Sequence, residues 1–297
     1  MSPTRHAAGR LWLAAMPGLF VFLWSTGFIG AKLGLPYAEP FTFLALRFGI
    51  VAVLLGAIAW SAGAPWPKTP EAVGHLAIAG LLVHGTYLGG VFASIHHGVS
   101  AGVSALIVGI QPLLTALLAG PLLGERVSVR AWLGLALGLV GVLLVVWTRI
   151  DVGEGTPLGY ALSVAALLGM TAGTLYQKRF CAAMDIRSGG VVQFVAAGAA
   201  MLAIAFAVET REVAWTPEFA VALFWLVFVM SLGAIALLYT LIRQGEAYRV
   251  STLFYLVPPS TALIAYALFG ETLGPLALLG MAVAAIGVAL VNASGSK

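Results

Sequence analysis

Two side chains that can bind a solute or a proton lie deep within an apolar stretch of the chain. His84 and Tyr87 are three residues apart, so they would share one face of a helix. A histidine in such a place can hydrogen-bond a solute or titrate near neutral pH. It can equally be a structural residue bonded to a neighbouring backbone carbonyl, and the sequence leaves both alternatives open.

Arg47 lies roughly two turns inside the second apolar stretch. An unpaired arginine there would cost at least ~2.5 kcal/mol on insertion scales, so its guanidinium must find a partner or reach the interface. The group could anchor a substrate carboxylate, whose two oxygens match its fork of donors. The simpler interpretation is that the side chain snorkels outward or holds a helix end.

Acidic residues are absent from the middle of every apolar stretch. Glu125 and Glu271 fall at the ends of two of them, so we interpret both as structural charges at the interface. This weakens the case for proton or sodium coupling through a buried carboxylate, although His84 leaves proton coupling open. Lys32 and Lys178 also stand at predicted helix ends, where snorkelling would explain both.

The adjacent residues His96 and His97 resemble a metal-binding pair. No acidic or cysteine partner accompanies them in the sequence, so a solvated loop is the preferred interpretation. The single cysteine, Cys181, leaves neither an intramolecular disulfide nor a cysteine pair for zinc. We therefore expect no metal and no cofactor.

Motifs of the common enzyme classes are missing from the chain. It contains no HExxH, no GxSxG and no P-loop, so no enzymatic activity is expected, and ATP-driven transport would need a partner subunit. Two alternatives from other classes stay open. One is a membrane-embedded, lipid-modifying enzyme with His84 or the pair of His96 and His97 as catalytic groups, and the other is a non-transporting binding or assembly protein.

Membrane-spanning helices must position these residues. Of the 297 residues 61% are hydrophobic and 9% are charged, with a mean hydropathy of +1.03, whereas soluble chains carry about 25% charged residues. The basic residues are scattered singly, which argues against nucleic-acid binding despite a net charge of +4. A spanning helix needs roughly 20 apolar residues, and the sequence offers ten such stretches, at about residues 11–31, 41–61, 73–94, 102–121, 131–148, 158–178, 189–208, 219–241, 250–269 and 275–292.

The basic residues predict the orientation of the chain, because lysine and arginine in short loops stay on the cytoplasmic side. With the N-terminus inside, eleven of them lie in the cytoplasm and three, Lys32, Arg149 and Arg211, lie outside. This bias favours two cytoplasmic termini and an even number of spans.

The two halves of the chain carry the same ordered residues. Ser104 and Pro112 match Ser251 and Pro259 at an offset of 147. Further matches, after one deletion or further upstream, are Gly124 with Gly270, Glu125 with Glu271, Gly134 with Gly280, Gly141 with Gly287, Gly98 with Gly245, Gly27 with Gly173, and Lys32 with Lys178. We therefore divide the chain into repeats at residues 1–148 and 149–297.

Each predicted repeat holds five helices, an odd number, so the second would enter the membrane in the opposite orientation to the first. Inverted repeats build many secondary transporters, whose substrate site lies near the midplane between the repeats. The predicted fold is an all-α membrane protein with ten transmembrane helices in two inverted five-helix repeats.

Three segments carry a resemblance to a known family: YLGGVFASIHHGVSAGVSALIVGIQPLLTALLAGPLLGERV, its partner LLYTLIRQGEAYRVSTLFYLVPPSTALIAYALFGETL, and the early FLWSTGFIGAK. Together with Arg47 they resemble the drug/metabolite transporter superfamily of EamA type. The resemblance implies a bacterial inner-membrane exporter of small metabolites. Amino-acid exporters, including the aromatic amino-acid exporter, are the kind it suggests, and export of other drugs or metabolites is the alternative.

The resemblance also implies a central cavity lined by aromatic residues, and tyrosine within hydrocarbon needs a partner for its hydroxyl. Such walls with few charges suit neutral or zwitterionic solutes that move by alternating access. The oligomeric state stays open. The residues expected to bind substrate are Trp24, Arg47, His84, Tyr87, Gln111, Tyr176, Tyr239 and Tyr255.

Overall fold

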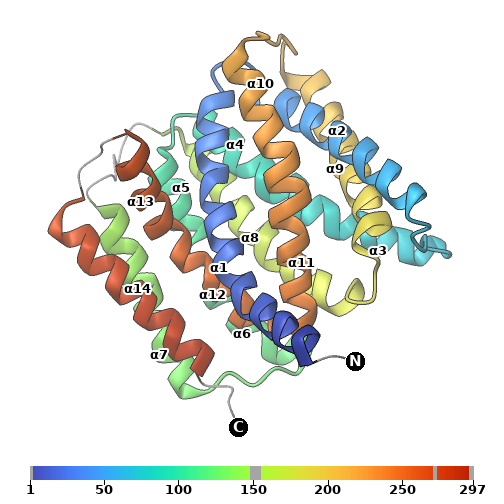
Figure 1. The fold of residues 1–297 in the computed structure, drawn as a ribbon. Helices are drawn as coiled ribbons and strands as arrows, with labels where there is room; N and C mark the ends of the chain where they lie inside the picture. The colour runs from blue at the N-terminus through green and yellow to red at the C-terminus, as the bar shows by residue number, and fades with distance from the viewer. Residues whose placement is uncertain (1–2, 148–154, 270–272, 294–297) are drawn as a thin grey trace.

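The computed structural model of the chain describes residues 3–147, 155–269 and 273–293. Within these ranges every element of regular secondary structure is a helix. One isolated β-bridge, between Ala38 and Val213, also occurs there. The predicted all-helical fold is therefore confirmed. Figure 1 shows the helices as a bundle in which α1 begins and α14 ends on the same side of the molecule.

The described residues of the first half of the chain form a succession of helices. They are α1 (Pro3–Gly34), α2 (Pro40–Ser61), α3 (Pro70–Gly80), the π-helix η1 (Leu81–Leu88), α4 (Gly89–His96), α5 (Ala101–Val108), α6 (Gln111–Leu123) and α7 (Val129–Val146).

The second half repeats this succession. Its elements are α8 (Pro157–Phe180), α9 (Ile186–Val208), α10 (Pro217–Phe224), the π-helix η3 (Trp225–Ala234), α11 (Ile235–Gln244), α12 (Ala247–Thr252), the 3₁₀-helix η4 (Leu253–Leu256), α13 (Val257–Phe269) and α14 (Pro275–Ala293).

Proline and short polar residues set the points at which these helices begin. Thr69, Thr156 and Thr216 each precede a helix and accept a hydrogen bond from a first-turn amide, which satisfies a donor that the helix cannot. A proline follows each of them at a position where its missing N–H costs nothing. Prolines lie at the first positions of α2, α3, α8, α10 and α14, and these are Pro40, Pro70, Pro157, Pro217 and Pro275.

Eight helical stretches of the described residues are long and apolar enough to cross a membrane. The continuous stretch from α3 to α4 and the one from α10 to α11 each count as one of them. Helix α1 has a shorter apolar part at Ala15–Ala31, and α12, η4 and α13 form a broken segment. A membrane protein of many spans is thus confirmed, and the count of ten stays a prediction.

Irregular turns occur at matching places in the two halves. The stretch that starts at Pro70 widens into η1, and the stretch that starts at Pro217 widens into η3. The fourth stretch breaks at Gly109 and Ile110, between α5 and α6, and its counterpart breaks at η4. Because π-turns are rare and often lie at functional sites, their repetition supports the repeat found in the sequence and directs attention to η1 and η3.

Glycines aligned between the halves form the contact of α7 with α14. A Cβ atom on Gly134 would lie 2.6 Å from the carbonyl oxygen of Gly287, and one on Gly280 would lie 2.7 Å from that of Gly141. Small residues let two helix backbones approach this closely in lipid. Figure 1 shows α7 and α14 side by side at one edge of the bundle, with α2 and α9 at the opposite edge.

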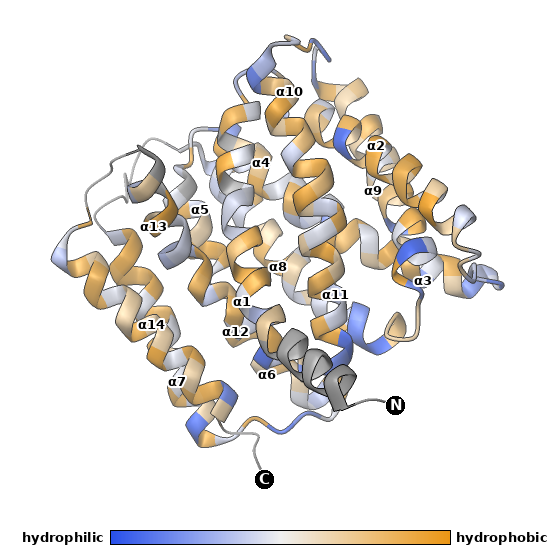
Figure 2. Cartoon of the chain, viewed as in Figure 1, coloured by the Kyte–Doolittle hydropathy of each residue, from blue (hydrophilic) through white to orange (hydrophobic). Residues whose placement is uncertain are grey.

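Hydropathy follows the expectation for a protein in a bilayer. Figure 2 shows apolar residues along the lengths of the helices and hydrophilic residues mainly at helix ends and connections. Large apolar side chains such as Val53, Trp60 and Phe206 are exposed, whereas Arg47 and His84 are buried. The polar chemistry of the spans therefore lies inside the bundle.

Candidate functional site

Arg47 of α2 is held inside the bundle. Its side chain is 2% exposed, and its Nε donates to Ser231 Oγ of η3 at 3.0 Å. The hydroxyl of Ser231 donates its own proton to the carbonyl of Leu226, five residues earlier in η3. The predicted snorkelling is therefore wrong. The ion pairs formed among the described residues do not include Arg47.

His84 of η1 begins a buried chain of hydrogen bonds. Its Nε2 lies 3.1 Å from the hydroxyl of Tyr239 on α11, which donates to Gln193 Oε1 on α9 at 2.5 Å. Gln193 Nε2 in turn donates to Gln177 Oε1 on α8 at 2.9 Å. The partner of His84 is thus a side chain from the other half of the molecule, and no bond to a backbone carbonyl is present in the described residues.

Aromatic rings enclose the imidazole of His84 and connect it with Arg47. The ring of Phe194 stacks on it with centroids 4.2 Å apart and an interplanar angle of 16°. Phe48 lies on another side, 5.9 Å from the imidazole and 5.8 Å below the guanidinium of Arg47. The cation and the imidazole therefore both lie near the ring of Phe48, in a region built by α2, η1 and α9.

A second aromatic group lies next to this region. Trp24 of α1 stacks with Tyr87 of η1 at 6.4 Å and 17°, and it meets the edge of Phe254 in η4 at 5.2 Å. Tyr87 follows His84 by three residues on η1, so this group adjoins the cluster around the imidazole. Phe254 belongs to the second half of the chain, so both halves contribute to the aromatic wall.

Gln111 and Tyr255 make no hydrogen bond or ring contact with this cluster among the described residues. Gln111 Nε2 donates to Thr115 and to Ser251 at 3.0 and 3.1 Å, which joins α6 to α12. Tyr255 packs over Gly138 of α7, where an added Cβ would lie 2.7 Å from the ring atom Cε2. The oxygen Oε1 of Gln111 and the hydroxyl of Tyr255 are buried without a hydrogen-bond partner among the described residues.

Tyr176 lies apart from the other predicted site residues. Its hydroxyl is 2.6 Å from Nδ1 of His75, and both rings stack near Phe180 at the end of α8. The structure therefore brings together Trp24, Arg47, His84, Tyr87 and Tyr239, with Gln111 and Tyr255 elsewhere in the core and Tyr176 near the boundary.

Gln177, Gln193 and Ser231 belong to the site although the sequence analysis did not select them. All three are polar residues within predicted spans, the same signal that selected Gln111. Their partners lie 16 to 184 positions away along the chain. Their type could have been noticed in the sequence, but their grouping depends on how the two halves pack.

A cavity opens where the hydrogen-bonded chain ends. Its lining includes Gln177, Cys181, Met184, Tyr239 and Arg243, from α8, its C-terminal turn and α11. Tyr239 therefore has one side toward the cavity and its hydroxyl in the buried chain. Gln177 and Tyr239, two members of that chain, border the cavity, which lies on the side that the charge bias predicts to be cytoplasmic.

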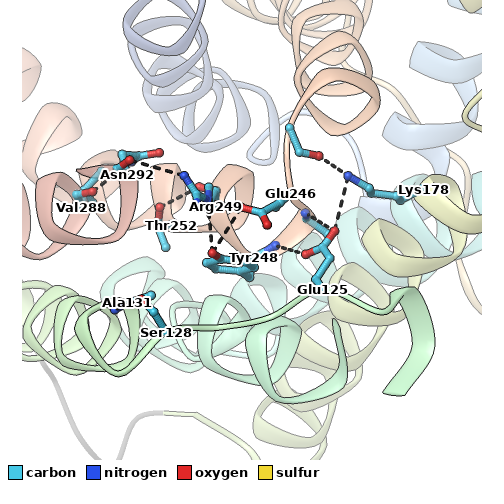
Figure 3. A network of polar contacts seen from close by, with 12 residues as sticks. Glu125, Ser128, Ala131, Lys178, Glu246, Tyr248, Arg249, Thr252, Val288 and Asn292 are labelled. Atoms are coloured by element: carbon cyan, nitrogen blue, oxygen red, sulfur yellow. Dashed lines mark hydrogen bonds and ion pairs between the residues drawn. The ribbon is translucent and has the colours of Figure 1, made fainter. Parts of the chain in front are cut away.

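The same side carries an ion pair that joins the two halves (Figure 3). Glu125, after α6, accepts from the backbone N–H of Ala247 at 2.8 Å and lies 3.3 Å from Lys178 Nζ. Lys178 also donates to the carbonyl of Gly245. The carboxylate thus sits at the N-terminus of α12, where a helix favours negative charge. We call this group, the side chains of Glu125 and Lys178 with the carbonyl of Gly245 and the N–H of Ala247, the latch.

The latch changes two expectations for single residues. Lys178 does not simply snorkel, because Glu125 and Gly245 both bind its ammonium group. Glu125 is a helix-end charge, as predicted, but it also contacts the other half of the chain. Glu271 and the side chain of Lys32, their sequence counterparts, lie outside the described residues.

Farther along α12 the polar contacts in Figure 3 are local. Arg249 forms an ion pair with Glu246, and its Nε donates a hydrogen bond to the hydroxyl of Tyr248. One Arg249 nitrogen also reaches the carbonyl of Asn292 on α14, at 3.4 Å. These contacts fix the start of α12 against α14 but do not touch α6 or α8.

On the opposite side of the molecule two loops hold each other. Glu209 accepts from the backbone and hydroxyl of Thr42, each at 2.7 Å, and Glu39 accepts from those of Thr210 at 2.7 and 2.6 Å. The hydroxyl of Thr210 is the largest of the contributions that keep the pKa of Glu39 below its usual value. This reciprocal clasp links the start of α2 to the chain after α9.

The histidines at this side make no metal site in the part of the chain that the structure describes. His97 Nδ1 lies 2.9 Å from the carbonyl of Ala93, and the His96 ring packs edge-on against that of His97. No group of three potential ligands occurs within the described ranges.

Curated relatives that align over most of this chain are membrane transporters. It is 27% identical over 273 residues to the probable amino-acid metabolite efflux pump of Escherichia coli K12, covering 88% of each chain. It is 25% identical over 275 residues to the inner membrane transporter YedA of the same strain, covering 91% of this chain and 87% of YedA. The transporter YvbV of Bacillus subtilis is 25% identical over 287 residues, with 94% and 91% covered.

Comparison with solved structures and family models agrees with these relatives. A crystal structure with 20% sequence identity has a TM-score of 0.80 and covers 94% of this chain and 96% of its own, which shows the same fold. The model of the EamA-like transporter family matches residues 12–147 and again residues 157–293. This protein therefore belongs to the EamA-like transporter family.

Proposed function

We propose that this protein is a secondary exporter of amino acids and similar zwitterionic metabolites, which it moves by alternating access through the buried cluster between its two halves. Arg47 carries the proposal. A cation that is 2% exposed, with one hydrogen bond to a neutral serine and no carboxylate in ion-pair contact among the described residues, is expensive to maintain. A substrate carboxylate would supply the missing negative charge.

Three further observations support the same function. Trp24, Tyr87 and Phe254 provide an aromatic wall for an apolar side chain. A relative that aligns over 88% of the chain is named for amino-acid metabolite efflux. The small cavity beside Tyr239 lies on the predicted cytoplasmic side, where the route of an exporter would begin.

The latch supports the alternating part of the mechanism. It ties the first half to the second through a few polar contacts at one end of the bundle, whereas the long helices pack through apolar surfaces. Polar contacts of this kind can break and re-form at modest cost. We propose that the latch closes the cytoplasmic end and opens when substrate enters.

Transport in proteoliposomes tests the proposal. We expect saturable counterflow of labelled L-phenylalanine or L-leucine, with an imposed pH gradient showing whether protons drive it. Arg47→Gln should raise the half-saturation concentration about tenfold to a hundredfold, the value of a hydrogen bond to a charged group. The half-saturation concentration of Arg47→Lys protein should lie between those of the wild type and Arg47→Gln, because lysine keeps the positive charge and loses the paired donors of the guanidinium.

The exposed Arg130 provides a matched control, since Arg130→Gln removes the same charge at a distance from the cluster. Each variant should first be shown to unfold at the wild-type temperature in detergent. Absence of amino-acid flux by the folded wild-type protein would reject the substrate class, and equal flux by wild-type and Arg47→Gln protein would reject the role of Arg47.

A further inference from the structure

We propose that the Nδ1 atom of His84 accepts a hydrogen bond from an ammonium group of the substrate. The proposal rests on the proposed function and narrows it to solutes that carry an amine beside their carboxylate. Tyr239, Gln193 and Gln177 are then positioning residues, because their hydrogen bonds hold the imidazole in the tautomer that makes Nδ1 an acceptor.

The orientation of the two glutamine amides comes from Met184. Its Sδ atom lies 3.5 Å from Gln177 Nε2 and 3.6 Å from Gln193 Nε2. A thioether sulfur can accept a weak hydrogen bond but cannot donate one. Both NH₂ groups therefore face the sulfur, because flipping either amide would place a carbonyl oxygen against it.

With the amides fixed, the direction of every bond in the chain follows. Gln193 Nε2 donates to Gln177, so Gln193 Oε1 is the acceptor that faces Tyr239. The hydroxyl of Tyr239 has one proton and spends it on this oxygen at 2.5 Å. The contact of 3.1 Å with His84 Nε2 must then use a proton on the imidazole.

The remaining nitrogen of a neutral His84 is therefore a bare acceptor. Nδ1 is buried and has no hydrogen-bond partner among the described residues. A doubly protonated ring would add a second positive charge beside Arg47, where no described carboxylate forms an ion pair. The site thus contains a buried lone pair without a donor, which favours a ligand that brings one.

The surroundings of Nδ1 suit an ammonium group in particular. Phe194 stacks on the imidazole and the tilted ring of Phe48 lies 5.9 Å from it, and aromatic rings attract cations. Arg47 lies 5.8 Å from the centroid of the Phe48 ring and repels a cation unless a carboxylate covers it. An amine alone would be disfavoured there, whereas an amino acid satisfies Arg47 and His84 together.

Matched ligands separate this inference from the proposed function. The probes are L-phenylalanine and 3-phenylpropanoate, which differ by the amine, and L-leucine with 4-methylpentanoate as a second pair. Each is measured as a competitor of labelled amino acid in binding to purified protein. Wild-type protein should prefer the amino acid of each pair by about tenfold to a hundredfold.

Two substitutions should reduce that preference. His84→Phe keeps a ring to stack on Phe194 and removes both nitrogens, and Tyr239→Phe removes the hydroxyl that fixes the tautomer. In both variants the preference within each pair should fall toward unity. Tyr160→Phe is the matched control, because the Tyr160 hydroxyl makes no hydrogen bond to the described residues, and it should keep the wild-type preference.

Nitrogen NMR of ¹⁵N-histidine protein in nanodiscs reads the tautomer without transport. The His84 signals are assigned by their loss in His84→Phe. We expect Nδ1 in the unprotonated range and Nε2 in the protonated range, with Nδ1 moving on addition of L-phenylalanine and staying in place with 3-phenylpropanoate. Tyr239→Phe should redistribute the two tautomers.

The outcomes are distinct. Amino acids that bind with the same preference in wild-type and His84→Phe protein would overturn the inference and leave the proposed function standing. A protonated Nδ1 in the wild-type protein would also overturn it. Failure of both amino acids to bind would reject the proposed function, and the inference with it.

Discussion

Replacing Glu125 by glutamine tests the latch most directly. The substitution keeps the shape of the side chain and removes the charge that Lys178 and the N-terminus of α12 bind. A hydrogen bond to a charged group contributes about 1.5–3 kcal/mol. Lys178 would keep its bond to Gly245 and its partial exposure to water, so we take about 2 kcal/mol, which is roughly a thirtyfold gain in the open population.

The native cysteine supplies the assay. Cys181 is the only cysteine of the chain, lines the cavity three residues after Lys178, and is 3% exposed. Burial raises the pKa of its thiol to about 11. Because the thiolate is the reactive form, a maleimide should react mainly with the open state, and the labelling rate should rise about thirtyfold in Glu125→Gln protein.

A nearby glutamate provides the control. The Glu246 side chain contacts Tyr248 and Arg249 of α12 and makes no hydrogen bond or ion pair with the described residues of α6 or α8, so Glu246→Gln should label at the wild-type rate. Equal labelling of Glu125→Gln and wild-type protein, with both folded, would refute the latch as a closure. Faster labelling in both glutamate variants would show a general loosening of α12 instead.

Two other features give predictions that do not involve substrate. Gly141→Ala should destabilise the protein by about 1–3 kcal/mol through overpacking, because the added Cβ would press on the backbone of Ala284, and its unfolding temperature in detergent should fall. A Cβ added at Gly56 would meet nothing within 4 Å, so Gly56→Ala should leave the unfolding temperature unchanged. The bond from Thr210 lowers the pKa of Glu39, so the clasp is stable above pH 4.5 and weakens as the pH falls through the lowered value; amide exchange at Thr210 should show this acid loss, and Glu39→Gln should abolish it.

The sequence predicted the architecture well where the signal is local or repeated. Pro70 and Pro217 fall in the gaps between predicted spans, and the structure has them in the first turns of helices. The glycines matched by the repeat lie at the α7–α14 contact, where Gly134 meets Gly287 and Gly141 meets Gly280. The π-turns could not be anticipated, because hydropathy is the same for α- and π-turns.

The site was predicted in part, and the misses have a common physical cause. Arg47 and Lys178 were interpreted as snorkelling because a sequence shows no partner for either. Their partners, Ser231 and Glu125, lie 184 and 53 positions away and come from the other half of the chain. Tyr176 was selected by residue type. It lies on α8 with Gln177, yet its hydroxyl faces His75 near the end of that helix. Residue type identified candidates, and packing between the halves decided which ones meet.

The symmetry of the scaffold shows why its centre can suit a zwitterion. Arg47 lies seven residues after the start of α2, and Gln193 lies seven after the start of α9. His84 and Ser231 each lie fourteen residues after the prolines that open α3 and α10. The structure joins these equivalent positions crosswise.

Arg47 contacts Ser231, and Gln193 reaches His84 through Tyr239. One pair therefore presents a cation and the other presents a neutral acceptor, at places that the repeat makes equivalent. Two arginines at these places would repel each other in a buried site and favour a doubly negative ligand. An amino acid has one negative and one positive end. Two repeats with the same backbone can therefore bind an amino acid between them only if their side chains differ at these equivalent positions, and in this chain they differ.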